Sequence, residues 1–350
     1  MHIAIVHDTV GQKDAPDTKD VLAQADAVAE ALRHIGHTHF RAEISLDMAT
    51  LVRTLSNGGA DLVFNLVESI GGKGRLIHLL PYCLDAVPLP YTGAPAQAML
   101  LTSNKIMAKK WMETSAIVTP AWIGPFPGGN GKDRFGSADK STWIVKSVWE
   151  HASIGLGPES IVKNLTADAA YAALAGRAPA LGGACFAEAF VDGREFNLSL
   201  LTAPDGPEVL PPAEIIFDGY TADMPRIVDY RAKWDEAAYE FHHTPRQFDF
   251  DTTDGDLLDT MLISSATSNG PAPRCRPVNR STPTSFPSAT RPVRPKSRRC
   301  SRATTASTPS HPSTPTPPSI YARMERWPSW MWTTTTATAA RISSIAAAMC

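Results

Sequence analysis

The chain of 350 residues is long enough for two or three domains, and its hydrophobic fraction of 43% is sufficient for buried cores. A formal net charge of −2 excludes a protein that is strongly basic or acidic as a whole. No charged segment followed by an apolar one opens the sequence, and no eighteen consecutive residues are apolar, so we expect a cytoplasmic protein without a membrane partner. The five cysteines lack C-x-x-C spacing, which indicates neither a disulfide framework nor a zinc site.

The N-terminal part alternates between strand and helix patterns. Residues 2–6 form a short apolar strand, and residues 20–32 carry apolar side chains at helical spacing. Residues 61–67 repeat the strand pattern and lead through Glu68 and a Gly-rich turn into a predicted helix at 76–84. This alternation predicts a doubly wound parallel sheet, in which ligands bind beyond the carboxyl ends of the strands. Glu68 lies at such an end, although a helix cap or a solvated position would explain it equally.

The middle of the chain combines lysines with a glycine-containing loop. After a turn at 88–93, residues 96–114 predict one helix, whose lysines are typical of a solvated face. Residues 118–123 predict an edge strand. A buried strand at 143–146 ends on Lys146 and is followed by a Ser-Ile-Gly run, in which backbone N–H groups can approach a phosphate that the lysine neutralises. The alternative is an edge-strand lysine beside an ordinary surface turn.

A third pattern predicts a β-hairpin after a short helix near 168–175. Strands at 184–190 and 195–201 are separated by an Asp-Gly turn. Glu188 and Glu195 lie on either side of this turn. Across a hairpin their carboxylates can face one cleft, but exposed acidic residues are common in hairpins, and that alternative stays open.

The composition changes abruptly after Asp259. Twelve lysines and arginines follow it but only one acidic residue, Glu325, and twelve prolines lie between Pro271 and Pro318. Such a segment buries too little apolar surface to offset its ordering entropy. It is therefore a disordered basic tail or the product of a reading-frame shift near codons 261–264, and the abruptness favours the shift. Without an RNA motif or interleaved aromatic residues, its charge predicts no specific nucleic-acid partner.

Five segments occur in an order and spacing shared with a known group of enzymes. They are Leu-Pro-Tyr-Thr-Gly at 89–93, the Asn-Lys pair at 104–105, the strand and loop at 144–155, Phe-Ala-Glu-Ala-Phe-Val-Asp-Gly-Arg-Glu-Phe at 186–196, and Asp-Tyr-Arg-Ala-Lys at 229–233. Together they resemble the ATP-grasp ligases, and most closely the D-alanine–D-alanine ligases.

The resemblance covers about residues 1–260 and implies an α/β ATP-grasp architecture. A doubly wound, Rossmann-like N-terminal domain would occupy residues 1–92, and a central ATP-grasp subdomain residues 93–187. The start of a C-terminal grasp subdomain would occupy 188–260, followed by the disordered or frameshifted tail at 261–350. The last subdomain would thus be incomplete.

The resemblance also implies a reaction and a set of site residues. In these ligases a carboxylate attacks the γ-phosphoryl group of ATP to form an acyl phosphate, and an amine then attacks its carbonyl, so catalysis consists mostly of positioning and charge neutralisation. Lys105 and Lys146 would hold the phosphates, and the loop of Ser153, Ile154 and Gly155 would cover them. Glu188, with the backbone of Ala189 and Val191, would bind adenine. Glu195 would bind the ribose, and Lys233 on a lid loop would reach the terminal phosphate. Lys233, Ser153 and Glu68 are the predicted catalytic residues.

The substrate-binding part departs from the family pattern. Residues 10–13 supply no acid where the family has a glutamate for the first substrate's ammonium, and Glu68 stands where many relatives carry a histidine. We therefore predict that Glu68 contacts the amine substrate. Ala152 and Trp234 replace a hydroxyl-bearing residue and a tyrosine, so the hydrogen-bonded link that joins loop and lid in the family cannot form here.

The family's magnesium ligands, an aspartate and a Glu-x-Asn segment, have no counterpart after Asp259. The resemblance implies ATP and Mg²⁺, but no metal-ligating residue is predicted in this chain. Three functions stay open: a D-alanine–D-alanine ligase supplying peptidoglycan synthesis, a ligase for another amino acid or a small peptide, and a non-catalytic ATP-binding protein. Amino acids are the expected substrates, and a homodimer stays open.

Overall fold

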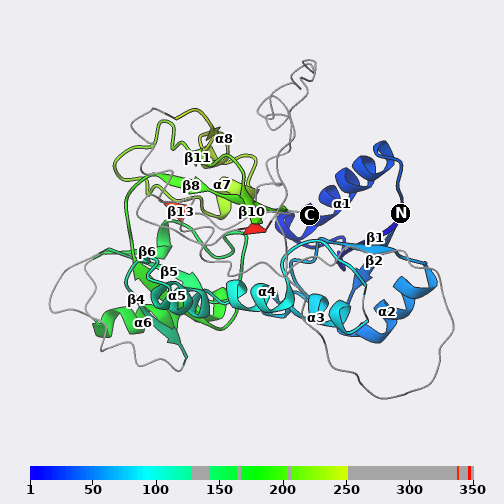
Figure 1. Ribbon diagram of the computed structural model, residues 1–350. Helices are drawn as coiled ribbons and strands as arrows, with labels where there is room; N and C mark the ends of the chain where they lie inside the picture. Colours follow the sequence, from blue (N-terminus) through cyan, green and yellow to red (C-terminus); the bar gives the residue numbers. More distant parts are fainter. Residues whose placement is uncertain are drawn as a thin grey trace, which may run out of the picture. The chain divides into compact units, whose positions relative to one another are not determined.

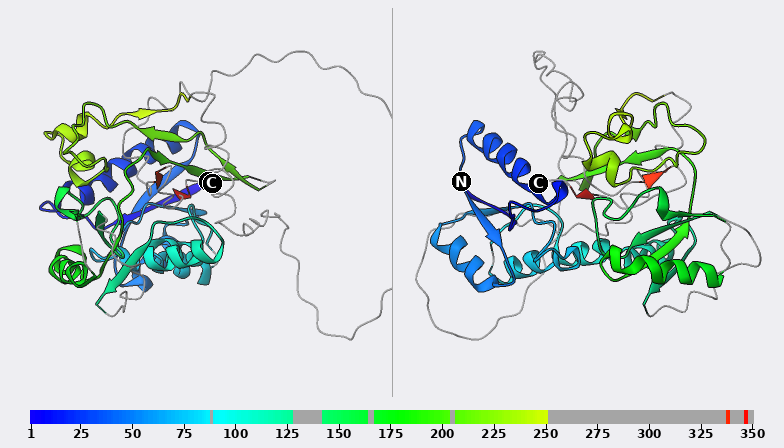
Figure 2. Two further views of the ribbon diagram at one scale, coloured as in Figure 1. Left: turned by 90° about the vertical axis from the view of Figure 1, so that its left-hand side faces the viewer. Right: turned by 180° about the vertical axis from the view of Figure 1, so that it is seen from behind.

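The computed structural model describes residues 1–87, 89–127, 142–163, 167–203, 206–250, 337–338 and 346–347 (Figures 1 and 2). Within these residues no helix has the length and apolar character needed to span a membrane. Most of the predicted tail at 261–350 and residues 251–260 lie outside the described residues. The predicted boundaries at 92, 187 and 260 stay predictions.

The N-terminal part is a parallel three-stranded sheet with helices on both faces. Its strands are β1 (His2–Asp8), β2 (Thr38–Ile44) and β3 (Leu62–Asn65), in the order β2-β1-β3. Its helices include α1 (Pro16–His34) and α2 (Met48–Asn57). The doubly wound parallel sheet is therefore confirmed, whereas β2 and α2 were not predicted.

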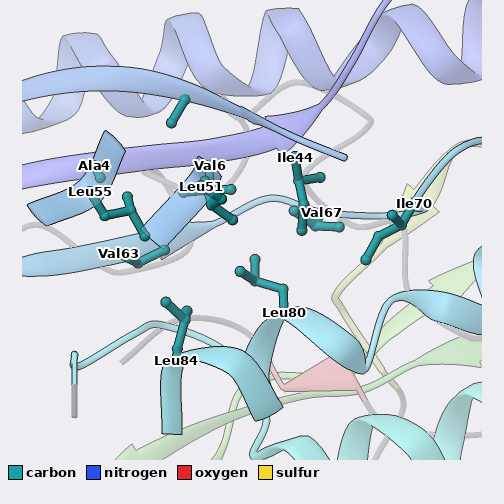
Figure 3. Close-up of a cluster of buried hydrophobic side chains, with 11 residues drawn as sticks. Ala4, Val6, Ile44, Leu51, Leu55, Val63, Val67, Ile70, Leu80 and Leu84 are labelled. Carbon is teal, nitrogen blue, oxygen red and sulfur yellow. The ribbon is translucent and has the colours of Figure 1, made fainter. Parts of the chain in front are cut away.

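Alternation along β1 explains why both faces are covered. Ile3 and Ile5 pack against α1 through Ala25, Val28 and Leu32. Ala4 and Val6 point to the other face, as successive strand residues must. There they meet a core with Leu51 and Leu55 of α2 and Leu80 and Leu84 of α3 (Leu79–Ala86), drawn in Figure 3. A single apolar strand thus places the carboxyl ends of β1 and β3 between two helical layers.

The predicted helix at 96–114 is in fact two helices. A 3₁₀ turn, η1 (Gly74–Leu76), and α3 precede α4 (Ala96–Ser103) and α5 (Lys105–Thr114). Asn104 interrupts the helical backbone with φ −90° and ψ 103°, and its side chain accepts hydrogen bonds from the N–H groups of Ile106 and Met107. Asparagine is a preferred N-cap because its oxygen binds otherwise unpaired N–H groups. The cap places Lys105 in the first turn of α5.

The central sheet is antiparallel and contains β4 (Trp122–Phe126), β5 (Trp143–Ser147), β6 (Ile161–Val162) and β7 (Cys185–Ala189). Their order is β4-β7-β5-β6, so an edge strand is present, but it begins at Trp122, four residues later than predicted. On one face, Val145 and Ala187 pack against α6 (Ala167–Arg177) and η4 (Ala178–Leu181). On the other face Phe186 packs against Ile106 of α5. A further 3₁₀ turn, η3 (Pro158–Ser160), precedes β6.

The predicted hairpin at 184–201 is wrong. Strand β7 pairs with β4 and β5, whereas β8 (Glu195–Asn197) pairs with β11 (Ala213–Ile215) and β13 (Ala337–Thr338). Because both edges of β7 are already taken, the following strand joins another sheet, completed by β12 (Arg246–Gln247).

The strand predicted at 195–201 is also divided. Strand β9 (Ser199–Ala203) lies in a separate sheet with β10 (Gly206–Val209) and β14 (Ala346–Ala347). Two short helices, α7 (Tyr230–Trp234) and α8 (Tyr239–His242), complete the described C-terminal part.

Candidate functional site

Lys146, Glu188 and Lys109 form a buried ion cluster on the face of the central sheet that α5 covers. Lys146 Nζ lies 2.6 Å from Glu188 Oε1, and Lys109 Nζ lies 2.8 Å from Glu188 Oε2. Burial opposes the charge of Glu188, but the two lysines outweigh it and lower its pKa to about 2. Lys109 is only 4% exposed, so the predicted solvated face of the helix is wrong at this position. The glutamate is therefore an anionic centre that positions two ammonium groups.

Lys105 is the second lysine whose predicted solvated position is wrong. Its Nζ donates a hydrogen bond to the backbone oxygen of Glu150 at 2.6 Å. Burial first, and then the charge of Lys146, lower its pKa to about 7, and Lys233 acts in the same direction. Lys105, Lys146 and Lys233 are hereafter called the three-lysine site. Two half-buried lysines that act on the charge of a third make a place suited to a polyanionic ligand.

The loop after β5 has an unusual backbone held by tertiary contacts. Ala152, Ser153 and Gly155 have φ values of 54°, 60° and 72°. Left-handed conformations cost alanine and serine free energy and occur preferentially at functional sites. Ser153 Oγ donates to the Val228 carbonyl at 2.8 Å, and Arg177 Nη2 donates to the Gly155 carbonyl at 2.7 Å. The left-handed backbone and the tertiary hydrogen bonds of this loop argue against an ordinary surface turn.

The segment around α7 contacts both this loop and helix α1. Trp234 Nε1 donates to the Ala152 carbonyl at 2.9 Å, and Tyr230 Oη donates to Asp17 Oδ1 at 2.6 Å. Asp229 caps α7 by accepting from the Ala232 N–H at 2.8 Å. These hydrogen bonds stand in place of the loop-to-lid link that the family pattern implies and this sequence lacks. They bring Lys233 toward the loop.

Acidic residues gather at the carboxyl ends of β1 and β3. Gln24 Nε2 donates to Glu68 Oε1 and to Asp20 Oδ2, each at 3.0 Å, and the Glu68 N–H donates to Asp8 Oδ1 at 3.0 Å. Burial raises the pKa of Glu68 to about 7, with Asp8, Asp20 and Asp17 adding to the rise against the opposing hydrogen bond from Gln24. Lys73 and His78 occupy the cap positions of the following helices, so the cap explanation for Glu68 is wrong.

Lys233 lies between this acidic group and Glu195. Burial lowers the pKa of Lys233, while Glu195 and Glu68 oppose the shift. Glu195 is 3% exposed and Glu188 is 7% exposed, so the alternative of exposed hairpin acids is wrong for both.

The two backbone positions predicted to bind adenine lie close together. Ala189 ends β7, and its N–H donates to the Ala121 carbonyl at 2.8 Å, while Val191 follows two residues later. Ile154 donates its N–H to the His151 carbonyl within the loop. The individual ligand contacts of Glu188, Ala189, Val191 and Glu195 stay predictions.

No family model matches the chain. The chain is 29% identical over 227 residues to the D-alanine–D-alanine ligase of Moorella thermoacetica, which covers 61% of this chain and 65% of that one. It is 29% identical over 209 residues to the ligase of Methylococcus capsulatus, at 59% and 63% coverage. An uncharacterised protein of Sinorhizobium fredii is 28% identical over 217 residues, at 57% and 58% coverage.

Among solved structures, D-alanine–D-alanine ligase of Bacillus anthracis complexed with ATP aligns with a TM-score of 0.53 at 15% identity, covering 77% of this chain and 78% of that one. The ATP-grasp fold is therefore shown. This chain is a relative of the D-alanine–D-alanine ligases. It spans about three fifths of the length of the curated relatives it matches.

The described part of this chain has no site that matches the magnesium site of ATP-grasp ligases. Among those residues, no group of three or more His, Cys, Asp or Glu side chains could hold a metal ion. The described residues thus offer no such group for Mg²⁺, and no step below is derived through a metal.

Sequence reasoning missed Lys109 and the contacts of Tyr230 in this ATP-grasp chain. Lys109 follows Lys105 by four residues, a spacing that places both side chains on one helix face. That signal was available, because the same face carries Ile106 against the sheet. The bond between Tyr230 and Asp17 joins residues 213 positions apart, and no local pattern predicts it.

Proposed function

We propose that the chain binds ATP at the three-lysine site and descends from ATP-dependent carboxylate–amine ligases of the D-alanine–D-alanine ligase type, with little turnover of its own because the family's metal ligands are missing from its sequence. The gathering of Lys105, Lys146 and Lys233 beside the strained loop supports this proposal most strongly. The charge of Lys146 and Lys233 lowers the pKa of Lys105, and a triphosphate supplies several negative charges at once to oppose that repulsion. The ATP complex of the Bacillus anthracis ligase supports the choice of nucleotide.

In the proposed reaction, the three-lysine site holds the phosphates and the loop at 153–155 covers them. The carboxylate of one amino acid attacks the γ-phosphorus, ADP leaves, and an acyl phosphate forms. The amine of a second amino acid then attacks the acyl carbon, inorganic phosphate leaves, and a peptide bond results. The lysines stabilise the charge that develops on the transferred group, which is the main contribution a protein makes to phosphoryl transfer.

The acidic group at the ends of β1 and β3 supports an amine contact by Glu68. A carboxylate with a pKa near 7 ionises readily when a substrate ammonium arrives, and Lys233 lies close enough to sense its charge. The amine would thus be held near the lysine that reaches the terminal phosphate. D-alanine itself, a cytoplasmic location and a role in peptidoglycan synthesis are parts of this proposal that rest on the family alone.

Two alternative functions differ from the proposed one in substrate or in chemistry. The Trp234–Ala152 and Tyr230–Asp17 bonds replace the family link beside the amine site, which favours a ligase for another amino acid or a small peptide. A non-catalytic ATP-binding protein is favoured by the missing magnesium ligands. A screen of phosphate release from ATP with single amino acids distinguishes the three functions when it is run on a chain whose Glu-x-Asn stretch is restored, because the unaltered chain is expected to release little phosphate in any case.

The test of the nucleotide site is calorimetric titration of ATP into the unaltered chain and into Lys146→Ala. Removing one ammonium from the phosphates should weaken ATP binding at least about tenfold, because charge-assisted hydrogen bonds are the stronger ones. Glu188 keeps Lys109 as a partner in this variant. Lys110→Ala, which removes an exposed lysine of α5, is the control. Equal ATP affinity of Lys146→Ala and the unaltered chain would refute the site.

A further inference from the structure

His151 lies between the strand that carries Lys146 and the loop at 153–155, and none of the functions above uses it. Its Nε2 is buried and has no hydrogen-bond partner among the described residues. Such atoms are rare in folded proteins, because an unsatisfied buried polar group costs about 1–3 kcal/mol. An unpaired ring nitrogen beside a ligand site is therefore a candidate for a ligand contact.

The imidazole lies against the backbone of Gly74, and the backbone of His151 is held within the loop. A Cβ added to Gly74 would lie 3.6 Å from His151 Cδ2 and 3.1 Å from the Trp149 carbonyl, so the backbone of Gly74 runs close to the ring. The His151 carbonyl accepts the Ile154 N–H at 3.0 Å. The preceding residue, Glu150, accepts the hydrogen bond from Lys105 through its carbonyl. His151 is thus adjacent in sequence to the residue that binds a lysine of the three-lysine site.

The charges around His151 decide what can pair with it. Burial and then the charges of Lys105 and Lys233 lower its pKa to about 3, so the imidazole is neutral at physiological pH. In the tautomer that carries its hydrogen on Nε2, this nitrogen is a donor, and neither ammonium group can accept its hydrogen bond. An anionic oxygen drawn in by the same lysines can accept it. A neutral donor also adds no fourth positive charge to the ligand-free site.

We propose that His151 Nε2–H donates a hydrogen bond to a β- or γ-phosphoryl oxygen of the nucleotide held by the three-lysine site. This inference rests on the proposed function and adds a specificity contact to it. His151 would help the site to distinguish a nucleoside triphosphate from a monophosphate, since only the longer phosphate chain extends to the lysines around the ring.

The experiment compares a replacement that keeps the ring without a donor with one that keeps a donor without the ring. His151→Phe keeps a ring against Gly74 but has no N–H, whereas His151→Gln keeps an amide N–H near the position of Nε2. His34→Phe, at an exposed position of α1, is the control. ATP and AMP are titrated into each protein in the presence of EDTA. We expect His151→Phe to bind ATP about tenfold more weakly, the loss typical of a charge-assisted hydrogen bond. AMP affinity should change less than twofold, and His151→Gln should retain most of the ATP affinity.

A spectroscopic readout on the unaltered chain covers the case in which His151→Phe does not fold. ATP should shift the ¹⁵N resonance of Nε2 toward that of a hydrogen-bonded donor, and AMP should not. Equal ATP affinity of His151→Phe and the unaltered chain, or an equal loss for ATP and AMP, would overturn the inference alone. If the unaltered chain bound no ATP, the proposed function would fail and this inference with it.

Discussion

Lys105 combines a buried ammonium with two neighbouring lysines, and this makes its protonation dependent on ligand. In the free protein its pKa is about 7, so at pH 8 most of the side chain is neutral. Triphosphate favours the charged form and raises the pKa. ATP binding at pH 8 should therefore be accompanied by uptake of most of a proton, whereas uptake by this group should vanish below about pH 6.

Calorimetry in buffers of different ionisation enthalpy measures this proton uptake. Lys105→Arg is the matched variant, because a guanidinium stays charged throughout this range and takes up no proton. Identical proton uptake by the two proteins at pH 8 would show that Lys105 is charged before the ligand binds.

Glu68 lowers the stability of the folded protein at neutral and higher pH. Its pKa rises from 4.5 to about 7 on folding, so the folded state disfavours its ionisation. The resulting cost is absent below about pH 4.5, grows as the pH rises to 7, and is constant above it. Glu68→Gln keeps an acceptor for Gln24 and removes the charge. It should raise the free energy of unfolding by about 1–3 kcal/mol at pH 8 and leave it unchanged at pH 4.

Urea unfolding at the two pH values tests this prediction. Glu30→Gln, at an exposed position of α1, should have no comparable effect. A Glu68→Gln chain that is less stable than the unaltered chain at pH 8 would mean that the carboxylate is ionised and stabilised in the folded protein.

For the helices and strands, the periodicity of the sequence predicted which elements exist better than it predicted which strands pair. The apolar patterns of β1 and β7 are strong enough to be recognised alone, because their burial is nearly continuous, and α1 can be recognised from the helical spacing of its buried residues. Strand β2 carries exposed or half-exposed residues at most positions and therefore gave no signal. The Asp-Gly turn suggested a hairpin, but the partners of β7 are chosen by the sheet, and residues 122–126 and 143–147 lie far away in sequence.

The loop after β5 supplies a prediction about a single glycine. Gly155 has φ 72°, and an added Cβ would overlap Leu181 Cδ2, in a side chain that is fully buried in the central core. Gly155→Ala should lower the free energy of unfolding by about 2–4 kcal/mol, from the left-handed backbone and the overpacked contact together.

Gly183→Ala separates these two causes. Gly183 has φ 86° but no atom within 4 Å of an added Cβ, so this variant carries the backbone cost alone. Thermal or urea unfolding of both variants should show the larger loss for Gly155→Ala. Equal losses would mean that Leu181 yields to the added methyl group and that the loop is not fixed by the core beneath it.

For the whole molecule, local patterns established the fold class but not the contacts that assemble the site. The Lys146 strand and the Ser-Ile-Gly loop could be predicted because they are contiguous in sequence. The bonds from Trp234 to the loop and from Tyr230 to Asp17 depend on tertiary structure, and so does the burial that shifts the pKa of Glu68 and Lys105.

The acid-poor sequence after Asp259 leads to a prediction about turnover. Without the family's metal-binding carboxylates, charge that develops during phosphoryl transfer is met by lysines alone. Loss of such preorganised stabilisation typically lowers rates about 100–1000-fold. Phosphate release from ATP with D-alanine or amino-acid mixtures should therefore stay near background for the unaltered chain and for a chain truncated after Asp259.

The positive control for that assay is the chain encoded by a gene in which a one-base change restores a Glu-x-Asn stretch. The restored chain should release phosphate when amino acids are added. Ordinary ligase rates in the unaltered chain would show that the reaction does not need the missing segment.

The central claim is that Lys105, Lys146 and Lys233 gather to bind the phosphates of ATP. Titration of adenosine, AMP, ADP and ATP into the unaltered chain, at low and high salt, measures it directly. We predict that affinity rises with each added phosphate and that the ATP affinity falls as salt screens the lysines. Equal affinities for adenosine and ATP, or no binding of ATP at low salt, would contradict the claim.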